Sequence, residues 1–192
     1  MDVSMISDLP DMIQLAIMAC DRPPKAIATD IECSVSAIYE AVRGTRQIPA
    51  KVMRDFSQTN LLAAASMALQ ATGLKCFFGY RKGDRHIQSR LVELKMYDKQ
   101  ADEAMHSLPE MLFNKNTRAE LSEEDLNDLI LAITKMVERD NVSFNLMMEL
   151  DVKYQLNLAD LMQKKETALA ATSTASSSKN IIKHHHYSIQ EI

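Results

Sequence analysis

The fold of this chain is decided by the stretch Ala28-Thr-Asp-Ile-Glu-Cys-Ser-Val-Ser-Ala-Ile-Tyr-Glu-Ala-Val-Arg43. Its apolar spacing predicts two short helices, one over about residues 24–32 and one over about residues 35–43. Ser34 stands between them at an N-cap position, where its hydroxyl can accept a backbone N–H of the following turn. Gly44 follows the second helix, where a left-handed residue commonly ends a helix. We therefore expect two helices joined by a tight turn.

The small side chain of Ala28 stands where two steeply crossing helices must approach closely. With the cap and the turn, this spacing is typical of a helix-turn-helix, whose second helix enters the DNA major groove while the first crosses the phosphate backbone. Glu32 holds the turn position at which glycine is usual, and a positive φ costs a non-glycine residue about 1 kcal/mol. The alternative is an ordinary helical hairpin with a small-residue crossing.

This stretch resembles the Cro and repressor class of phage regulators. The positions that match are Ala28, Ile31, Cys33, Ser34, Ser36, Ala37, Ile38, Ala41 and Val42. The resemblance implies a double-stranded DNA partner and a second helix that faces the groove. Carried over to the matching positions, it implies that the groove-facing residues are Ser34, Val35, Ser36 and Tyr39, with Arg43 one turn further on.

The side chains at these positions suit DNA in different ways. Ser34 and Ser36 can contact phosphates or base edges, and Val35 can meet a thymine methyl group. Arg43 and Arg46 are expected to hold phosphates, which positions the helix without reading the sequence. Glu40 either accepts a hydrogen bond from a cytosine amino group or points outward. The expected DNA-binding residues are Lys25, Ser34, Val35, Ser36, Tyr39, Glu40, Arg43 and Arg46.

The composition predicts an all-α protein. Among 192 residues there are four glycines, five prolines and no tryptophan, while Leu, Ala, Met and Glu are frequent, which favours helix nearly throughout. No apolar run reaches the roughly 18 residues of a membrane helix, and the first residues lack the pattern of a signal peptide. The three cysteines have no paired spacing, so we expect reduced thiols in a cytoplasm.

The charge distribution bears on how such a chain would bind DNA. The formal net charge is -4, with a mildly basic segment at residues 75–99 and an acidic one at residues 100–151. A single copy with this balance should bind DNA weakly, so pairing two copies would help.

The first 73 residues are expected to form the helix-turn-helix DNA-binding domain. A helix over 8–20, capped by Asp8, should pack across the two central helices. A further helix opens at Pro49, and the apolar run from Leu61 ends at Gly73. Residues 74–86 are expected to be a connector. Its aromatic residues either fill the joint between two helical layers or, with the neighbouring basic residues, contact nucleic acid.

Residues 87–166 are predicted to be a helical body that mediates oligomerisation. It should contain three amphipathic helices. The first covers about 87–107 and the third about 143–165. The second begins after a capping box at Ser122 and contains the apolar residues from Leu126 to Val137. The three helices can bury one another in a bundle or bury remaining apolar stripes across a dimer, and the sequence does not choose between these. Residues 167–192 are rich in Ala, Ser and Thr, which is typical of a flexible tail. Its three consecutive histidines favour a solvated end over a metal site.

No catalytic, cofactor, metal or small-molecule motif emerges, so an enzyme is not expected. The layout of an N-terminal helix-turn-helix, an Ala/Leu-rich helix, an aromatic connector and a helical body also resembles the phage regulatory CII family. That resemblance implies an oligomeric transcriptional regulator of lysogeny in a bacterial host cell. The alternative is a protein-interaction module, such as an antirepressor, in which the helix-turn-helix is only a scaffold. The acidic balance, Glu32, Glu40 and the few basic residues on the second helix favour that alternative.

Overall fold

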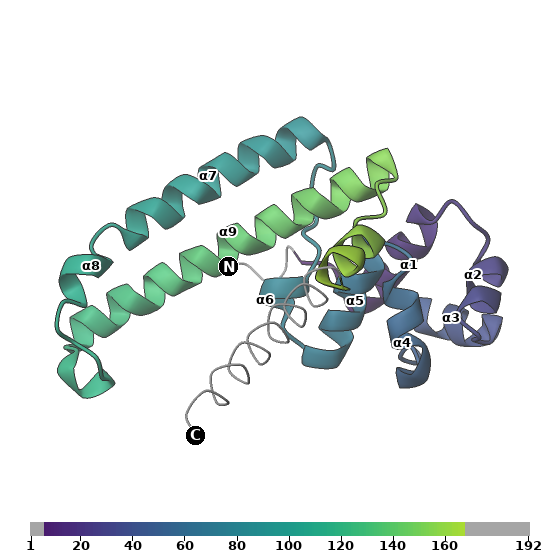
Figure 1. The fold of residues 1–192 in the computed structure, drawn as a ribbon, viewed down its shortest axis with the longest axis horizontal. Helices are drawn as coiled ribbons and strands as arrows, with labels where there is room; N and C mark the ends of the chain where they lie inside the picture. The colour runs from purple at the N-terminus through teal and green to yellow at the C-terminus, as the bar shows by residue number, and fades with distance from the viewer. Residues whose placement is uncertain (1–5, 168–192) are drawn as a thin grey trace, which may run out of the picture.

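The computed structural model describes residues 6–167, and the regular structure in that range is helical apart from one antiparallel bridge between Ile6 and Arg81. The predicted all-α class is confirmed. The helices are α1 (Leu9–Ala19), α2 (Pro24–Asp30), α3 (Val35–Val42), α4 (Ala50–Ser57), α5 (Leu61–Thr72), α6 (Lys75–Phe78), α7 (Ile87–Met105), α8 (Leu108–Met111) and α9 (Glu123–Tyr154), with a 3₁₀ turn at Arg118–Glu120 and further helical backbone at 158–167. Figure 1 shows α7 and α9 as a long hairpin with α8 near its tip, and the short helices α1 to α5 gathered at its other end.

Helix α5 lies at the centre of the N-terminal core. It packs against both α1 and α4. Its small residues Ala63, Ala65 and Ser66 are buried, so neighbouring backbones can approach closely, while Leu62 and Phe56 of α4 supply buried volume. A helix that is apolar nearly all round is stable in water only when it is surrounded in this way. The apolar run from Leu61 therefore determines where the other short helices pack.

Several helix ends form as the sequence predicts. Gly73 ends α5 in a left-handed conformation at φ 70°, a geometry that glycine adopts without a steric penalty. Ser122 and Asp125 form the expected reciprocal capping box at the start of α9. The Asp125 carboxylate accepts hydrogen bonds from Lys115 and from Ser122, which lower its pKa to about 2.

Asp8 does not cap α1 as expected. It occupies the N-cap position, but its carboxylate makes no capping hydrogen bond. Instead Asp8 Oδ1 lies 2.7 Å from Lys75 Nζ, and the hydrogen bond and charge of Lys75 lower the pKa of Asp8. A partner 67 residues away has replaced the local backbone donor.

The prediction of two separate helices after Ser122 was wrong, because α9 runs unbroken for 32 residues, from Glu123 to Tyr154. The polar run at 138–141 resembles a break, yet it contains neither proline nor glycine to interrupt the backbone. Its Asn141 side chain donates across to the Phe77 and Gly79 carbonyls. The chain turns only at Gln155 and Asn157, which take φ of 50° and 53°, and helical backbone resumes at residue 158.

Buried polar side chains of α9 attach it to residues 79–85. Asn145 donates to the Gly79 carbonyl at 3.1 Å and accepts from the Arg81 N–H at 2.7 Å. Glu149, which is 4% exposed, accepts from the Tyr80 hydroxyl and from Arg85 Nε at 3.0 Å. Burial, followed by the hydrogen bond to Glu149, raises the pKa of Tyr80 to about 12. The long helix is thus held at a defined angle to the short ones.

The connector residues take part in this joint. Arg81 donates to Glu93 Oε1 at 3.1 Å and to the Tyr97 hydroxyl at 2.9 Å, both on α7. Phe78 packs against the N-terminal core, while Phe77 is 41% exposed. Arg81 therefore neutralises the charge of Glu93 on α7, and Phe78 fills the joint between the hairpin and the short helices.

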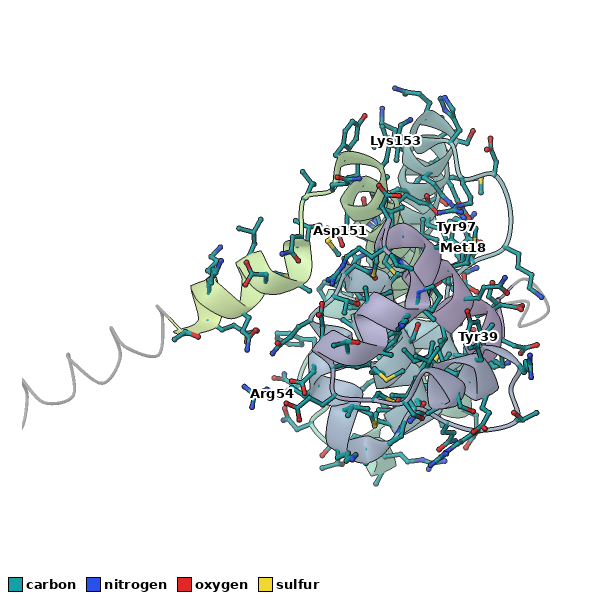
Figure 2. The ribbon with its side chains drawn as sticks, turned by 90° about the vertical axis from the view of Figure 1, so that its right-hand side faces the viewer. Met18, Tyr39, Arg54, Tyr97, Asp151 and Lys153 are labelled. Carbon is teal, nitrogen blue, oxygen red and sulfur yellow. The ribbon has the colours of Figure 1, made fainter. Side chains whose placement is uncertain are left out.

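The carboxylate of Asp151 bonds two helix starts at once. Its Oδ2 accepts the Leu61 N–H at 2.9 Å, at the N-terminus of α5, and its Oδ1 accepts the Leu158 N–H at 2.8 Å. The residue is 2% exposed. Free N–H groups and the positive end of the helix dipole make such sites favourable for a carboxylate. Figure 2 shows Asp151 between the end of α9 and the helical segment that follows it.

We predict that Asp151→Ala lowers the free energy of unfolding by about 3 kcal/mol, because two backbone donors lose their acceptor. Chemical denaturation followed by circular dichroism measures the loss. Asp160→Ala is the control: Asp160 pairs with Lys164 at 2.6 Å on the surface of the same region, and its loss should cost less than about 0.5 kcal/mol. Equal effects of the two substitutions would show that Asp151 does not hold these helix starts.

Candidate nucleic-acid interface

Helices α2 and α3 are joined by a turn with defined hydrogen bonds. The Cys33 N–H donates to the Ala28 carbonyl at 2.8 Å, and Glu32 takes φ 51°. The Ser34 hydroxyl accepts from the Ala37 N–H at 3.2 Å and so caps α3. Gly44, at φ 72°, follows α3. The predicted N-cap, the left-handed glycine and the strained non-glycine turn residue are all present.

The inward sides of the two helices fix their rotation. Ile27 and Ala28 of α2 and Ile38 and Ala41 of α3 are at most 1% exposed, and Ile31 at the end of α2 is 2% exposed. All five residues belong to the main hydrophobic core. The remaining side of α3 is left to solvent.

The outward side of α3 carries polar residues. Ser36, Tyr39 and Arg43 are exposed, Tyr39 by 47%. Figure 2 shows Tyr39 on the side of the molecule turned toward the viewer, within the group of short helices. Val35 lies at the border: it is half-buried and packs on the core. Val35, the first residue of α3, is therefore less exposed than the sequence predicted.

Glu40 organises the C-terminal end of this face. Its Oε1 accepts from the Ser36 hydroxyl at 3.0 Å, and its Oε2 lies 3.4 Å from Arg46 Nη1. The Glu40 carbonyl also accepts from the N–H and hydroxyl of Thr45, at 3.0 and 3.1 Å. The ion pair is open to water, with the side chains 58% (Arg46) and 39% (Glu40) exposed, so solvent and salt weaken it. We name Ser36, Glu40 and Arg46 the Glu40 cluster.

The other basic residues near α3 differ in their pairing. Arg22 Nη2 lies 2.5 Å from Asp30 Oδ2, across α2. Within residues 6–167, Lys25 of α2 and Arg43 after α3 are exposed and form no ion pair. These two side chains can meet phosphates without breaking an internal contact.

Sequence reasoning did not predict that Ser36, Glu40 and Arg46 contact one another. Ser36 and Glu40 are four residues apart on a helix, a spacing at which side chains meet. That signal could have predicted their hydrogen bond. The approach of Arg46 depends on the turn after Gly44 and has no comparable local signal.

The rest of the described chain offers no metal cluster: in residues 6–167, no group of three or more His, Cys, Asp or Glu side chains is placed to hold an ion. His86 and His106 are both exposed. The run of three histidines lies outside the described residues. No helix within that range is long and apolar enough to cross a membrane.

Comparisons of this chain with protein-family models, with curated proteins and with solved structures find no match.

The rotation of α3 predicts opposite effects for two adjacent residues. Ile38→Ala should lower the free energy of unfolding by about 2–5 kcal/mol, because it leaves a cavity in the core. Tyr39→Ala should change it by less than about 0.5 kcal/mol, because the ring makes no core contact. Denaturant titration of both variants measures this. A large loss of stability in Tyr39→Ala would mean that the ring belongs to the core.

Proposed function

We propose that this chain is a sequence-specific double-stranded DNA-binding regulator in which α2 and α3 form a helix-turn-helix. The observation that carries the proposal is the rotation of α3: a capped helix buries Ile38 and Ala41 and leaves Ser36, Tyr39 and Arg43 in solvent. A recognition helix needs this arrangement, because its outer side chains must reach base edges while its inner side stays packed.

Each outward group has a role that its chemistry allows. The Ser36 hydroxyl and the Tyr39 ring and hydroxyl can contact base edges in the major groove. Arg43 and Lys25, which have no internal ion pair in residues 6–167, would hold phosphates on either side of the groove. Ser34 is occupied as the cap and would contribute through its position in the turn. Val35 would offer only its exposed edge to a thymine methyl group.

The Glu40 cluster would be remodelled when DNA binds. A carboxylate near phosphates is repelled, but Glu40 meets the DNA with Arg46 and Ser36 already attached to it. Because exposed ion pairs are weak, Arg46 can exchange Glu40 for a phosphate at small cost. Glu40 would then be free to accept from a cytosine amino group, so the cluster links backbone contact to base selection.

The resemblances to the Cro and repressor class and to the phage CII family extend the proposal. They suggest a phage or prophage regulator of lysogeny that acts as an oligomer in the bacterial cytoplasm. A single chain with net charge -4 is attracted only weakly to DNA. Pairing two copies would raise the affinity, since two tethered sites bind far more tightly than one.

An antirepressor-like protein-interaction module is the second candidate, favoured by the engagement of Arg46 with Glu40 and by the acidic balance. Gel shifts at low and moderate salt, with DNA from beside the gene and with unrelated DNA as competitor, separate the two. A regulator retards the adjacent DNA selectively. A protein-interaction module retards neither, and that result would overturn the proposal.

We predict that Tyr39→Ala weakens binding to the specific DNA by about 1–3 kcal/mol, because the ring contacts base edges. Binding to unrelated DNA should change little. Fluorescence anisotropy with both DNAs measures the two affinities. An equal loss on specific and unrelated DNA would place Tyr39 on the backbone.

We predict that Glu40→Gln strengthens DNA binding and steepens its salt dependence, because Arg46 then meets its phosphate without giving up an ion pair, and no freed carboxylate takes up a cation in its place. The phosphate contact of Arg46 then contributes its full share, about -0.9, to the slope of log affinity on log salt. Glu32→Gln is the matched control: it removes the same charge from the exposed turn, away from Arg46, and should leave the slope unchanged. The same slope change in both variants would rule out the exchange.

A further inference from the structure

One side of α9 is apolar, and its two central side chains are exposed in the part of the chain that the structure describes. It consists of Leu126, Ile130, Ile133 and Val137, which we name the α9 seam. Ile130 and Ile133 are 53% and 50% exposed, and Leu126 and Val137 are half-buried. For side chains of this kind, contact with water is unfavourable.

The α9 seam does not face α7. Residues on the α7 side of α9 include Ala132, which is fully buried, and Lys135, whose Nζ lies 3.4 Å from Gln100 Oε1 of α7. Ala132 is two residues from Ile130, hence about 200° around the helix. Figure 1 shows α7 along one side of α9 and the short helices beside the C-terminal half of α9.

The spacing of the α9 seam is that of two helices packed along their length. Successive members are 4, 3 and 4 residues apart, which is the alternation of apolar positions in coiled coils. This order is the same when it is read from either end. An antiparallel copy of α9 therefore places Leu126 opposite Val137 and Ile130 opposite Ile133, in both directions at once. Such self-complementarity is the requirement of a two-fold interface.

Charge does not oppose this pairing. Between Leu126 and Val137 the charged residues are Asp128 and Lys135, seven residues apart and thus on one side, the side on which Lys135 contacts α7. The neighbours of the seam on its outer flanks, Asn127 and Thr134, are uncharged. Within the four apolar layers, two copies of net charge -4 can therefore meet without like charges opposite one another.

The surroundings of the seam favour the antiparallel orientation. Its continuation toward the C-terminus meets α6, where Phe77 and Phe78 line a groove with Phe144 and Met147. In a parallel pair the short helices of both copies would gather at that same end. In an antiparallel pair the short helices of the two copies lie at opposite ends, and the N-terminal halves of the two α9 helices pack side by side.

We infer that the α9 seam is the surface through which two copies of this chain associate, as antiparallel α9 helices. The inference rests on the proposed function in one respect, because it identifies the contact that would join two DNA-binding units. The association itself needs no DNA. Four apolar layers are a small interface, which places the dissociation constant on the order of 1–100 µM.

Sedimentation equilibrium of the full chain across that concentration range tests the inference without DNA. The wild-type protein should pass from monomer to dimer. Ile133→Asp should raise the dissociation constant at least tenfold, because it buries a carboxylate at the centre of the seam. Leu131→Asp is the matched control: Leu131 is 52% exposed on the same helix but lies off the seam, so its dimer should persist. Circular dichroism verifies that both variants remain helical.

Cysteine crosslinking tests the orientation. In an antiparallel pair, Ile130→Cys copies mixed with Ile133→Cys copies should form more disulfide-linked dimer than either variant alone, over the background of the native cysteines. A chain that stays monomeric throughout, for instance because its own tail covers the seam, overturns the inference. So does a dimer that survives Ile133→Asp, or one that Leu131→Asp disrupts equally. None of these outcomes bears on whether α3 binds DNA, which the gel shifts decide separately.

Discussion

The arrangement of this molecule depends on one buried carboxylate. Asp151 accepts the Leu61 N–H at 2.9 Å and the Leu158 N–H at 2.8 Å while it is 2% exposed. A carboxylate so deeply buried is tolerated only with full hydrogen bonding. The last turn of α9 must therefore stay at the N-terminus of α5, the helix around which α1 and α4 pack. Met148 and Leu158 then complete the same core.

This constraint ties the hairpin to the surface proposed to contact DNA. Asn141 and Asn145 hold the Gly79 carbonyl, and Glu149 holds Tyr80 and Arg85. These contacts form a second attachment, which extends from about half a turn to about three turns along α9 from Asp151. Two attachments on one rigid helix leave little freedom between the hairpin and α3. Pairing through α9 would thus set the spacing and direction of two recognition helices, which a flexible linker could not do.

Local sequence chemistry predicted the α2–α3 unit well. The Ser34 cap, the left-handed Gly44, the strained Glu32 and the outward Tyr39 each follow from interactions within about five residues, and each is present. The sequence left open whether the helices of the body bury one another completely, and the exposure of Ile130 and Ile133 shows that they do not within residues 6–167. The all-α class followed from the scarcity of glycine and proline, because the other residues favour helix unless something interrupts them.

What only the tertiary structure decided depends on partners that are distant in sequence. The unbroken length of α9 was not predictable from its polar middle, because the Asn141 amide group donates to the distant Gly79 carbonyl and does not end the helix. Asp8 stays at the N-cap position of α1, but its carboxylate bonds Lys75, 67 residues away, in place of the local backbone. The sequence by itself determined where helices begin and end when a neighbouring residue supplies the hydrogen bond. Tertiary structure decided where a side chain exchanges that local bond for a remote one, because a buried polar group takes whichever partner the packing brings within reach.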